Sequence, residues 1–352
     1  MTHHIAVLGG DGIGPEVTQA AVTVGLAAVE DPSAIEVTWH DFGYGAQLEC
    51  GESFPEATQV ACARADAVLL GAIGAPGTLP ADVPRPERGL LALRAMLGTY
   101  ANLRPVRPHP DLIDASPLRP ERVRGTDILF VRELTGGLYF GQRHTTEDQA
   151  TDTATYTVAE IERVVRQACA LAQTRDGRLT SVDKANVLAT SRLWRRVVDE
   201  VVAAYPDVQH EHVLVDAMAM HLIARPTDFD VVVTANLFGD ILTDEAAMLA
   251  GSIGMMPSAS VGDQGRGLYE PIHGTAPDLA GKGVANPCGA MHSMAWLLRV
   301  SCGMEDAANR LEQAVDRAIA SGVRTPDLGG TATTQAVVDA VLTNLEARQV
   351  AS

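Results

Sequence analysis

The stretch Val231-Val-Val-Thr-Ala-Asn236-Leu-Phe-Gly-Asp240-Ile-Leu-Thr-Asp244-Glu245 joins a short apolar run directly to a segment with helix-like spacing. A short apolar run followed by turn residues is typical of a buried strand. The same alternation recurs along most of the chain, with further strand candidates at residues 5–8, 35–39, 67–70, 128–131, 179–182 and 213–215. This pattern predicts an α/β protein whose sheet is at least partly parallel.

Length and composition limit the possible classes of protein. The chain has 352 residues, which predicts one large domain or two of medium size, and its formal net charge is −17. Such an acidic surface repels a phosphate backbone, so we expect no nucleic-acid partner. No apolar run is long enough for a membrane span, and the first residues lack a leader-like segment, which predicts a cytoplasmic protein without membrane contact. The five scattered cysteines form no CxxC pair and predict neither disulfides nor a cysteine zinc site.

One glycine-rich motif resembles a dinucleotide-binding fingerprint without matching it. Gly10-Asp-Gly-Ile-Gly-Pro-Glu16 follows a strand candidate, as a dinucleotide-binding fingerprint does. Position 15 is Pro rather than Gly or Ala, and no ribose-binding acid stands at the usual spacing after a second strand. We therefore expect a tight strand-to-helix turn, with Pro15 near the first helical turn, and no Rossmann fold.

Three aspartates are candidates for binding a divalent cation. Asp240 and Asp244 stand four residues apart, so on a helix their carboxylates share one face. Clustered oxygens suit Mg²⁺ or Mn²⁺, whereas the alternative is a solvated acidic face. Asp216 ends the strand candidate at residues 213–215, where it could be a third ligand or, equally well, a helix N-cap.

Basic and phenolic side chains occur singly in apolar settings. Arg94, Arg104 and Arg132 are each commonly structural, but three of them beside an acidic cluster suggest a dicarboxylate substrate. Lys184 follows the strand candidate at residues 179–182, and Tyr139 lies in the polar, extended segment 136–156. Both can act as acid or base when burial and neighbours shift their pKa, although each is more often structural.

Six motifs in a fixed order give the chain a family resemblance. They are Gly10-Asp-Gly-Ile-Gly-Pro-Glu16, Asn102-Leu-Arg-Pro105, Val131-Arg-Glu-Leu-Thr-Gly-Gly137, Val182-Asp-Lys-Ala-Asn-Val187, Asn236-Leu-Phe-Gly-Asp-Ile241 and Glu270-Pro-Ile-His-Gly-Thr-Ala-Pro-Asp278. Together they resemble the isocitrate and isopropylmalate dehydrogenase family from about residue 4 to about residue 340. The resemblance implies an open, twisted mixed sheet in two domains, residues 1–99 with 252–352 and residues 100–251, with substrate and cofactor held in a cleft.

The resemblance also implies a role for each candidate residue. Arg94, Arg104 and Arg132 would bind the carboxylates of a malate. Asp240 and Asp244 of one subunit would bind Mg²⁺ or Mn²⁺ together with Asp216 of the other. Lys184, also from the other subunit, would help to take the hydroxyl proton, and Tyr139 would protonate the enol. The active sites would thus be shared within a homodimer, and segment 136–156 would serve as an arm of its interface.

Substrate and cofactor preferences follow from the same resemblance. At Glu87-Arg-Gly-Leu-Leu91, Leu90 and Leu91 would offer an apolar wall to an alkyl substituent, although both could be ordinary core residues. Asp278 would accept ribose hydroxyls and repel a 2′-phosphate, which favours NAD over NADP. The same cofactor site would include Ile13, His273, Gly274, Ala276 and Asn286.

The expected reaction is NAD-dependent oxidative decarboxylation of a 3-alkylmalate, with 3-isopropylmalate giving 4-methyl-2-oxopentanoate in leucine biosynthesis. Several positions depart from the family pattern, among them Gly289 and His292, where small or aliphatic residues are usual. These departures leave open a paralogue that acts on another 3-substituted malate in a specialised pathway. A catalytically silent regulatory subunit is the other alternative, and it predicts a broken set of catalytic residues.

Overall fold

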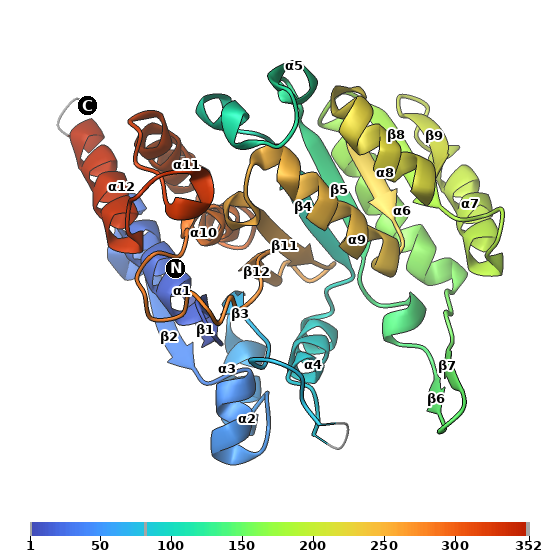
Figure 1. Cartoon of the computed structure of the whole chain (residues 1–352), viewed down its shortest axis with the longest axis horizontal. Coiled ribbons are helices and arrows are strands. Elements are labelled where there is room, and N and C mark those ends of the chain that lie inside the picture. The colour runs from blue at the N-terminus through green and yellow to red at the C-terminus, as the bar shows by residue number, and fades with distance from the viewer. Residues whose placement is uncertain (1, 81–82, 350–352) are drawn as a thin grey trace. The chain divides into compact units, whose positions relative to one another are not determined.

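The computed structural model describes residues 2–80 and 83–349. The chain forms two compact units, one made of Met1–Thr99 with Ser252–Ser352 and the other of Tyr100–Gly251. Each unit has a mixed sheet with helices against it, which confirms the α/β prediction (Figure 1). Among the described helices we find none with both the length and the apolar character of a membrane span.

The sheet of the first unit has the strand order β2-β1-β3-β12-β11. Strands β1, β2, β3 and β12 run parallel, and β11 is antiparallel to β12. Its strands are β1 (His3–Gly10), β2 (Ile35–His40), β3 (Ala67–Ala72), β11 (Pro257–Val261) and β12 (Gly267–Pro271). Its helices are α1 (Gly14–Ala28), α2 (Tyr44–Cys50), α3 (Glu56–Arg64), α4 (Glu87–Leu97), α10 (Cys288–Val300), α11 (Glu305–Ala320) and α12 (Thr334–Gln349).

The second unit has the strand order β4-β5-β10-β8-β9. Strand β4 is antiparallel to β5, and the other neighbours are parallel. The strands are β4 (Ala101–Val106), β5 (Ile128–Glu133), β8 (Arg178–Asp183), β9 (Gln209–Leu214) and β10 (Val231–Thr234). The helices are α5 (Pro120–Val123), α6 (Val158–Gln173), α7 (Ala189–Val202), α8 (Val215–Ala224) and α9 (Asn236–Ala247). Helix α6 packs with α7, and α8 with α9 (Figure 1).

Local sequence signals explain where these elements begin and what they bury. All four side chains of β10 are buried, as its apolar run predicts. Helix α6 starts with a capping box, in which the Thr157 hydroxyl accepts from Glu160 N and the Glu160 carboxylate accepts from Thr157 N. The same helix buries Ile161, Val164 and Val165, which lie three and four residues apart on one face.

Two details of the sequence prediction were wrong. Strand β9 ends at Leu214 and Val215 already belongs to α8, so Asp216 lies in the first turn of a helix and not at the end of a strand. Segment 136–156 was expected to be extended throughout, but it contains the short 3-10 helix Gly137–Tyr139. The rest of it carries the two-stranded hairpin of β6 (Arg143–Thr145) and β7 (Ala150–Asp152), whose side chains are exposed.

The glycine-rich motif after β1 forms a tight turn, as its sequence indicated. Gly10 has a φ of 73°, a region that L side chains rarely adopt. Pro15 lies in the first turn of α1, where a missing N–H costs nothing. The order of the first sheet and its antiparallel strand β11 also differ from a Rossmann fold. The glycines therefore serve the close packing of a turn.

Gly14→Ala tests how close that packing is. A Cβ at position 14 would lie 2.2 Å from Gly9 O and 2.7 Å from Ala72 N, and neither backbone atom can move aside easily. We expect the substitution to lower the free energy of unfolding by about 3 kcal/mol or more, at the upper end of overpacking effects. Urea unfolding measures this, with Gly45→Ala as the control because its Cβ would meet only an Asp11 oxygen at 3.8 Å. Equal unfolding midpoints for the two variants would contradict the tight turn.

Candidate active site

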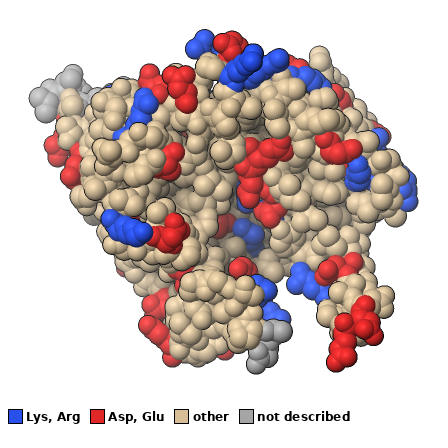
Figure 2. Space-filling model, in the orientation of Figure 1, with Lys and Arg blue, Asp and Glu red and all other residues tan. Residues whose placement is uncertain are grey.

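The sheet of the second unit brings the candidate residues to one edge. Strands β5, β10, β8 and β9 are parallel neighbours, so their carboxyl ends meet at the same edge. Arg132 lies at the end of β5, and Asp240 lies in α9, which begins directly after β10. Lys184 follows β8, and Asp216 lies at the start of α8 after β9. Figure 2 shows a group of acidic side chains over α9.

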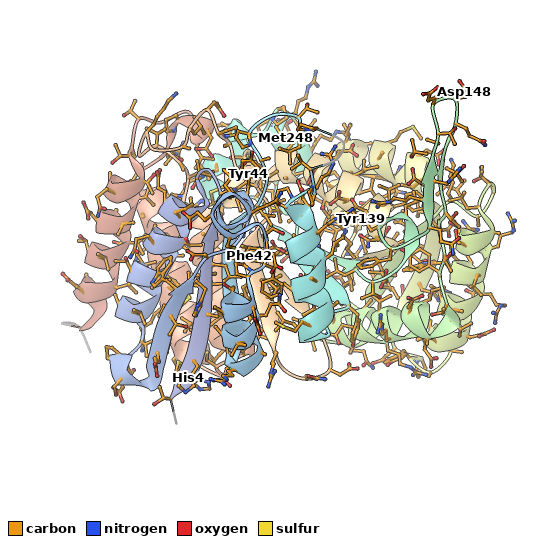
Figure 3. The ribbon with its side chains drawn as sticks, turned by 90° about the horizontal axis from the view of Figure 1, so that it is seen from below. His4, Phe42, Tyr44, Tyr139, Asp148 and Met248 are labelled. Atoms are coloured by element: carbon orange, nitrogen blue, oxygen red, sulfur yellow. The ribbon has the colours of Figure 1, made fainter. Side chains whose placement is uncertain are left out.

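Arg132, Asp240 and Tyr139 form a connected cluster within this edge. The buried Arg132 guanidinium donates through Nη1 to Asp240 Oδ1, in a short contact. Tyr139, labelled in Figure 3, donates its hydroxyl to the other carboxylate oxygen, Asp240 Oδ2, at 2.7 Å. The Arg132 guanidinium also lies 5.5 Å from the centre of the Tyr139 ring. One carboxylate therefore orients both the arginine and the phenol.

Arg104 extends the cluster from the neighbouring strand β4. Its Nε donates to Asn102 Oδ1 at 2.7 Å, and its Nη1 donates to Thr243 Oγ1 at 2.6 Å. The guanidinium lies 3.9 Å from Asp240 Oδ1 and 3.8 Å from Asp244 Oδ1. Because Asp240 and Asp244 project toward the same arginine, the helical pairing of their carboxylates that the sequence predicted is present.

The electrostatic setting of the cluster shifts three pKa values. Burial favours the neutral form of Asp240, but Arg132, the Tyr139 hydrogen bond and Arg104 outweigh it and lower the pKa. Burial dominates at Asp244 and raises its pKa, although Arg104 opposes this. Burial and the hydrogen bond to Asp240 raise the pKa of Tyr139, so its hydroxyl keeps its proton at neutral pH. Tyr139 is thus held in its protonated form.

Lys184 and Asp216 form a second group at the same edge. Lys184 Nζ lies 2.5 Å from Asp216 Oδ1, and the hydrogen bond from this lysine lowers the pKa of the carboxyl. The Asp216 side chain is 61% exposed and the lysine 25%. The two residues meet because they follow β8 and β9, which are neighbours in the sheet. In the same way, Arg132 and Asp240 meet because β5 and β10 are neighbours.

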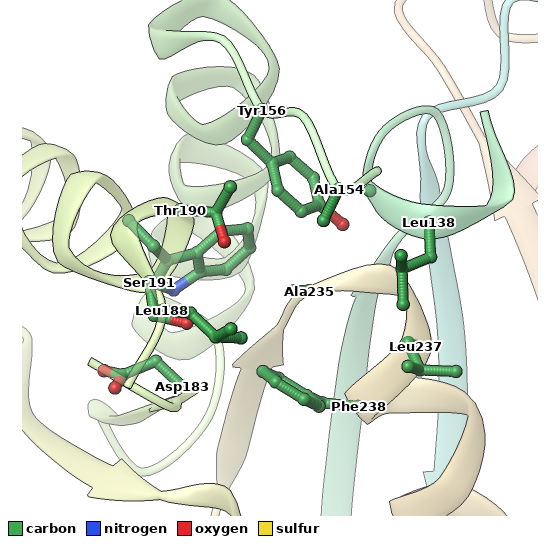
Figure 4. A pocket seen from close by; sticks show the side chains of 12 residues that line it. Leu138, Ala154, Tyr156, Asp183, Leu188, Thr190, Ser191, Ala235, Leu237 and Phe238 are labelled. Carbon is green, nitrogen blue, oxygen red and sulfur yellow. The ribbon is translucent and has the colours of Figure 1, made fainter. Parts of the chain in front are cut away.

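An apolar pocket lies next to both groups without containing either. Figure 4 shows Leu138 and Tyr156 on one side of it, with Leu188 and Phe238 nearby. Trp194 and Asp183 also line it, and the Asp183 carboxylate is already bound by Arg195 Nε at 2.6 Å. The described lining includes no arginine or lysine, so this pocket offers nothing to a dicarboxylate.

Arg94, in the first unit, is paired with a carboxylate of the same unit. Its Nη2 donates to Glu270 Oε1 at 2.8 Å, and both side chains are largely buried. Its Nε is also buried and finds no hydrogen-bond partner among the described residues. A buried donor left unsatisfied is costly, which is expected of a group that meets a ligand.

Most of the residues predicted to bind a cofactor follow β1 or β12. These two strands are parallel, so they end at the same edge of the first sheet. Ile13 is buried, and its N–H donates to Thr275 O at 2.9 Å. His273 is buried, which lowers its pKa, and its Nε2 has no partner within residues 2–80 and 83–349. Ala276 has a φ of 38°, while Gly274 and Asp278 are exposed. The hydrogen bond from Ile13 to Thr275 thus joins the glycine-rich turn after β1 to the loop after β12, and this loop carries the histidine nitrogen that lacks a partner.

Asn286 and the start of α4 complete the set of predicted residues. Asn286 is buried, its Oδ1 accepts from Cys288 N at 3.0 Å, and its Nδ2 donates to Asp327 Oδ2 at 2.9 Å. Glu87 is exposed in the first turn of α4. Leu90 is half-buried against the hydrophobic core of this unit, whereas Leu91 is half-buried outside that cluster. Leu90 therefore has a structural role in addition to any contact with a ligand.

A family model for isocitrate/isopropylmalate dehydrogenases matches residues 4–341. The chain belongs to this family. Among curated relatives, a 3-isopropylmalate dehydrogenase of Rhodopirellula baltica is 54% identical over 93% of this chain and 93% of its own. The 3-isopropylmalate dehydrogenase of Bacillus subtilis is 50% identical over 97% of this chain and 96% of its own. Family membership makes the chain a dehydrogenase of the decarboxylating type.

Solved structures of the isocitrate/isopropylmalate dehydrogenase family agree with this fold. Isocitrate dehydrogenase from Methylococcus capsulatus has a TM-score of 0.87 and 33% identity, covering 98% of this chain and 99% of its own. A beta-decarboxylating dehydrogenase from Thermococcus kodakarensis, in its apo form, has a TM-score of 0.81 and 38% identity, with coverages of 99% and 98%. The expected mixed-sheet fold of this family, distinct from a Rossmann fold, is thereby confirmed.

Several residues that organise the site were missing from the sequence prediction. Asn236 accepts two hydrogen bonds from Arg132, and Glu270 pairs with Arg94. Asp11 accepts from the N–H groups of Tyr44, Gly45 and Gly74, so it ties the first glycine-rich turn to the start of α2 and to the segment after β3. Asn236, Glu270 and Asp11 lie inside the quoted motifs. Their position next to predicted ligands was a usable signal, but their partners are far away in sequence.

Proposed function

We propose that this chain is an NAD- and divalent-metal-dependent enzyme that oxidises and decarboxylates 3-isopropylmalate to 4-methyl-2-oxopentanoate in leucine biosynthesis. The proposal rests on relatives of that name at 50–54% identity, together with one structural observation. That observation is the cluster in which Asp240 holds both Arg132 and the Tyr139 hydroxyl. It combines an anion-binding group, a cation-binding group and a proton donor.

The chemistry of the available donors fits both proposed cofactors. Asp240 and Asp244 offer carboxylate oxygens on one helix face, which hard cations such as Mg²⁺ and Mn²⁺ prefer. The orphaned Nε2 of His273 and the exposed carboxylate of Asp278 offer polar partners to a nucleotide. When bound, the metal would lower the pKa of the substrate hydroxyl and stabilise negative charge on its oxygen, and NAD would accept the hydride.

The residues of the chain would divide the remaining work. Arg94, Arg104 and Arg132 would bind and orient the two carboxylates of the substrate, because a guanidinium matches a carboxylate in shape and charge. Lys184 would receive the hydroxyl proton as the carbon is oxidised. After CO₂ has left, Tyr139 would deliver a proton to carbon, for which its raised pKa keeps it protonated.

We further propose that the enzyme works as a homodimer in which Lys184 and Asp216 complete the partner's site. The support is a set of exposed apolar side chains on α8 and α9, helices that pack together, and directly after α9. They are Met220 and Ile223 on α8, Ile241 on α9, and Met248 at the end of α9. Exposed apolar groups gathered in this way are typical of an interface. The hairpin β6–β7, which carries Asp148 at its tip in Figure 3, would serve as an arm of this interface.

The test is NADH formation by the purified protein with Mg²⁺ or Mn²⁺. We expect 3-isopropylmalate to be turned over with a higher kcat/KM than isocitrate, tartrate or a bulkier 3-alkylmalate. A clear preference for a different malate would overturn the substrate and leave the reaction class standing. If none of the four is oxidised, the catalytic proposal fails and a regulatory subunit becomes the better explanation.

Cofactor preference gives a separate prediction at Asp278. We expect Asp278→Asn to lower the ratio of kcat/KM with NAD to that with NADP by about 10- to 100-fold, the worth of one charge-assisted hydrogen bond. Initial rates with both cofactors measure the ratio. Asp306→Asn, which removes an exposed carboxylate from the first turn of α11, is the matched control and should leave the ratio unchanged. An unaltered ratio in Asp278→Asn would remove this residue from the proposed cofactor site.

A further inference from the structure

Two histidines and an aspartate meet at the outer strand of the second unit, in a group that the proposed reaction does not use. Strand β9 lies at the edge of its sheet. His210 and His212 are two residues apart along this strand, so both side chains project from the same face. The third member, Asp199, lies in α7. Its Oδ1 lies 3.2 Å from His210 Nε2 and 3.0 Å from His212 Nε2.

These distances are close to those within a tetrahedral metal centre. Zinc bonds to imidazole nitrogen and carboxylate oxygen are about 2.0–2.1 Å long, so the ligand atoms of a tetrahedral site lie about 3.3 Å apart. The three candidate ligand atoms here all lie within 4.8 Å of one another. The His210 and Asp199 side chains are 32% and 58% exposed, so small rotations of both can close the remaining difference.

His212 adds an independent sign of a ligand. Its second ring nitrogen, Nδ1, is buried and has no hydrogen-bond partner among the residues that the structure describes. The nearest carboxylate, that of the buried Asp183, lies 3.9 Å from it. A histidine that binds a metal through Nε2 carries its proton on Nδ1, and such a proton is usually directed at a carboxylate. The Asp183 carboxylate, fixed by Arg195 and by Ala185 N, is placed to receive it.

We propose that Asp199, His210 and His212 form a zinc-type site, separate from the proposed Mg²⁺ or Mn²⁺ site. Two imidazoles and one carboxylate suit Zn²⁺ far better than Mg²⁺, which prefers oxygen ligands. Three protein ligands leave a fourth position for water, and the exposure of Asp199 leaves that position open to solvent. Bound Zn²⁺ would fasten the edge strand β9 to α7 and so stabilise this side of the unit.

Calorimetric titration with Zn²⁺ tests the proposal directly. The titration is made in excess Mg²⁺, which occupies carboxylate sites, and in a Cys50→Ser background, because Cys50 is an exposed thiol. We expect one Zn²⁺ per chain, and at least a tenfold weaker affinity in His210→Gln. In the double variant His210→Gln/His212→Gln this binding should be lost. His40→Gln, at the end of β2, an edge strand of the first unit, is the matched control and should bind like the unsubstituted background.

Equal Zn²⁺ binding by the Cys50→Ser background and by the double variant would overturn the site. A second measurement needs no substitution at the ligands, so it still decides if these variants fail to fold. Co²⁺ added to the Cys50→Ser protein should give the intense visible bands of a tetrahedral centre, and Zn²⁺ should displace them. A weak octahedral spectrum would also refute the proposal. Neither readout involves dehydrogenase activity, so this proposal and the proposed reaction can fail separately.

Discussion

Lys184→Met should lower kcat for 3-isopropylmalate by about 10²- to 10⁴-fold, the usual contribution of a positioned acid or base. Methionine keeps most of the length of the side chain but cannot accept the hydroxyl proton. The lysine holds Asp216, a largely exposed carboxylate, so breaking this ion pair should change the melting temperature little. Steady-state rates of NADH formation measure the effect, and thermal unfolding shows that the variant is folded.

The control for this experiment is the other lysine of the sequence. Lys282→Met removes the same charge at an exposed position of the first unit, and we expect its kcat to match that of the unchanged enzyme. If Lys184→Met also keeps its kcat, Lys184 is not the proton acceptor. A fall in affinity for the substrate at constant kcat would indicate a binding role for the lysine in place of a catalytic one.

Asp240→Asn should lower kcat/KM by about 10²- to 10³-fold, because it would remove a charged oxygen ligand of the proposed metal site, and with it several kcal/mol of metal-dependent stabilisation. Asp240 also orients Arg132 and the Tyr139 hydroxyl, so the amide disturbs all three functions together. We therefore expect a higher concentration of Mg²⁺ to be needed for half-maximal rate. A Mg²⁺ titration of the rate at saturating substrate measures this.

A carboxylate on the same helix provides the comparison for Asp240. Glu245→Gln makes the same chemical change five residues further along α9, at a side chain whose pKa is raised by burial. It should leave the requirement for Mg²⁺ unaltered. If both variants need the same raised concentration of Mg²⁺, the loss of one negative charge from α9 explains the effect, and Asp240 would not be a metal ligand.

The parts of the fold that the sequence predicted are those with strong local patterns. The apolar run of β10 and the capping box of α6 each depend on residues close together in the chain, so pattern alone locates them. The predicted end of the strand at Val215 was wrong. Valine favours a strand locally, but in the folded chain β9 ends at Leu214 and α8 begins at Val215. The 3-10 turn at Gly137–Tyr139 was missed because such short turns have no periodic signal.

The sequence named the residues of the candidate site, but it did not show how these residues are connected. Motifs marked Asp240 and Arg132, yet nothing in the sequence showed that the two are joined directly, because they lie 108 residues apart. The pairing of Arg94 with Glu270 spans 176 residues and was missed for the same reason. Such contacts depend on how helices and strands that are far apart in the chain pack against one another. Asp199, His210 and His212 escaped notice because their partnership also requires the packing of α7 against an edge strand.

The direct bond between Arg132 and Asp240 has a thermodynamic consequence. The two opposite charges neutralise each other in the absence of ligands. An anion that binds the Arg132 guanidinium therefore leaves the Asp240 carboxylate without its partner and next to a second negative charge. A cation that binds the carboxylate likewise leaves the guanidinium without its partner. Binding of the anion thus frees the carboxylate for a cation, and binding of the cation frees the guanidinium for an anion. By linkage this coupling is reciprocal: dicarboxylate should tighten metal affinity by the same factor by which metal tightens dicarboxylate affinity. Together they should bind far more strongly than the two separate affinities suggest.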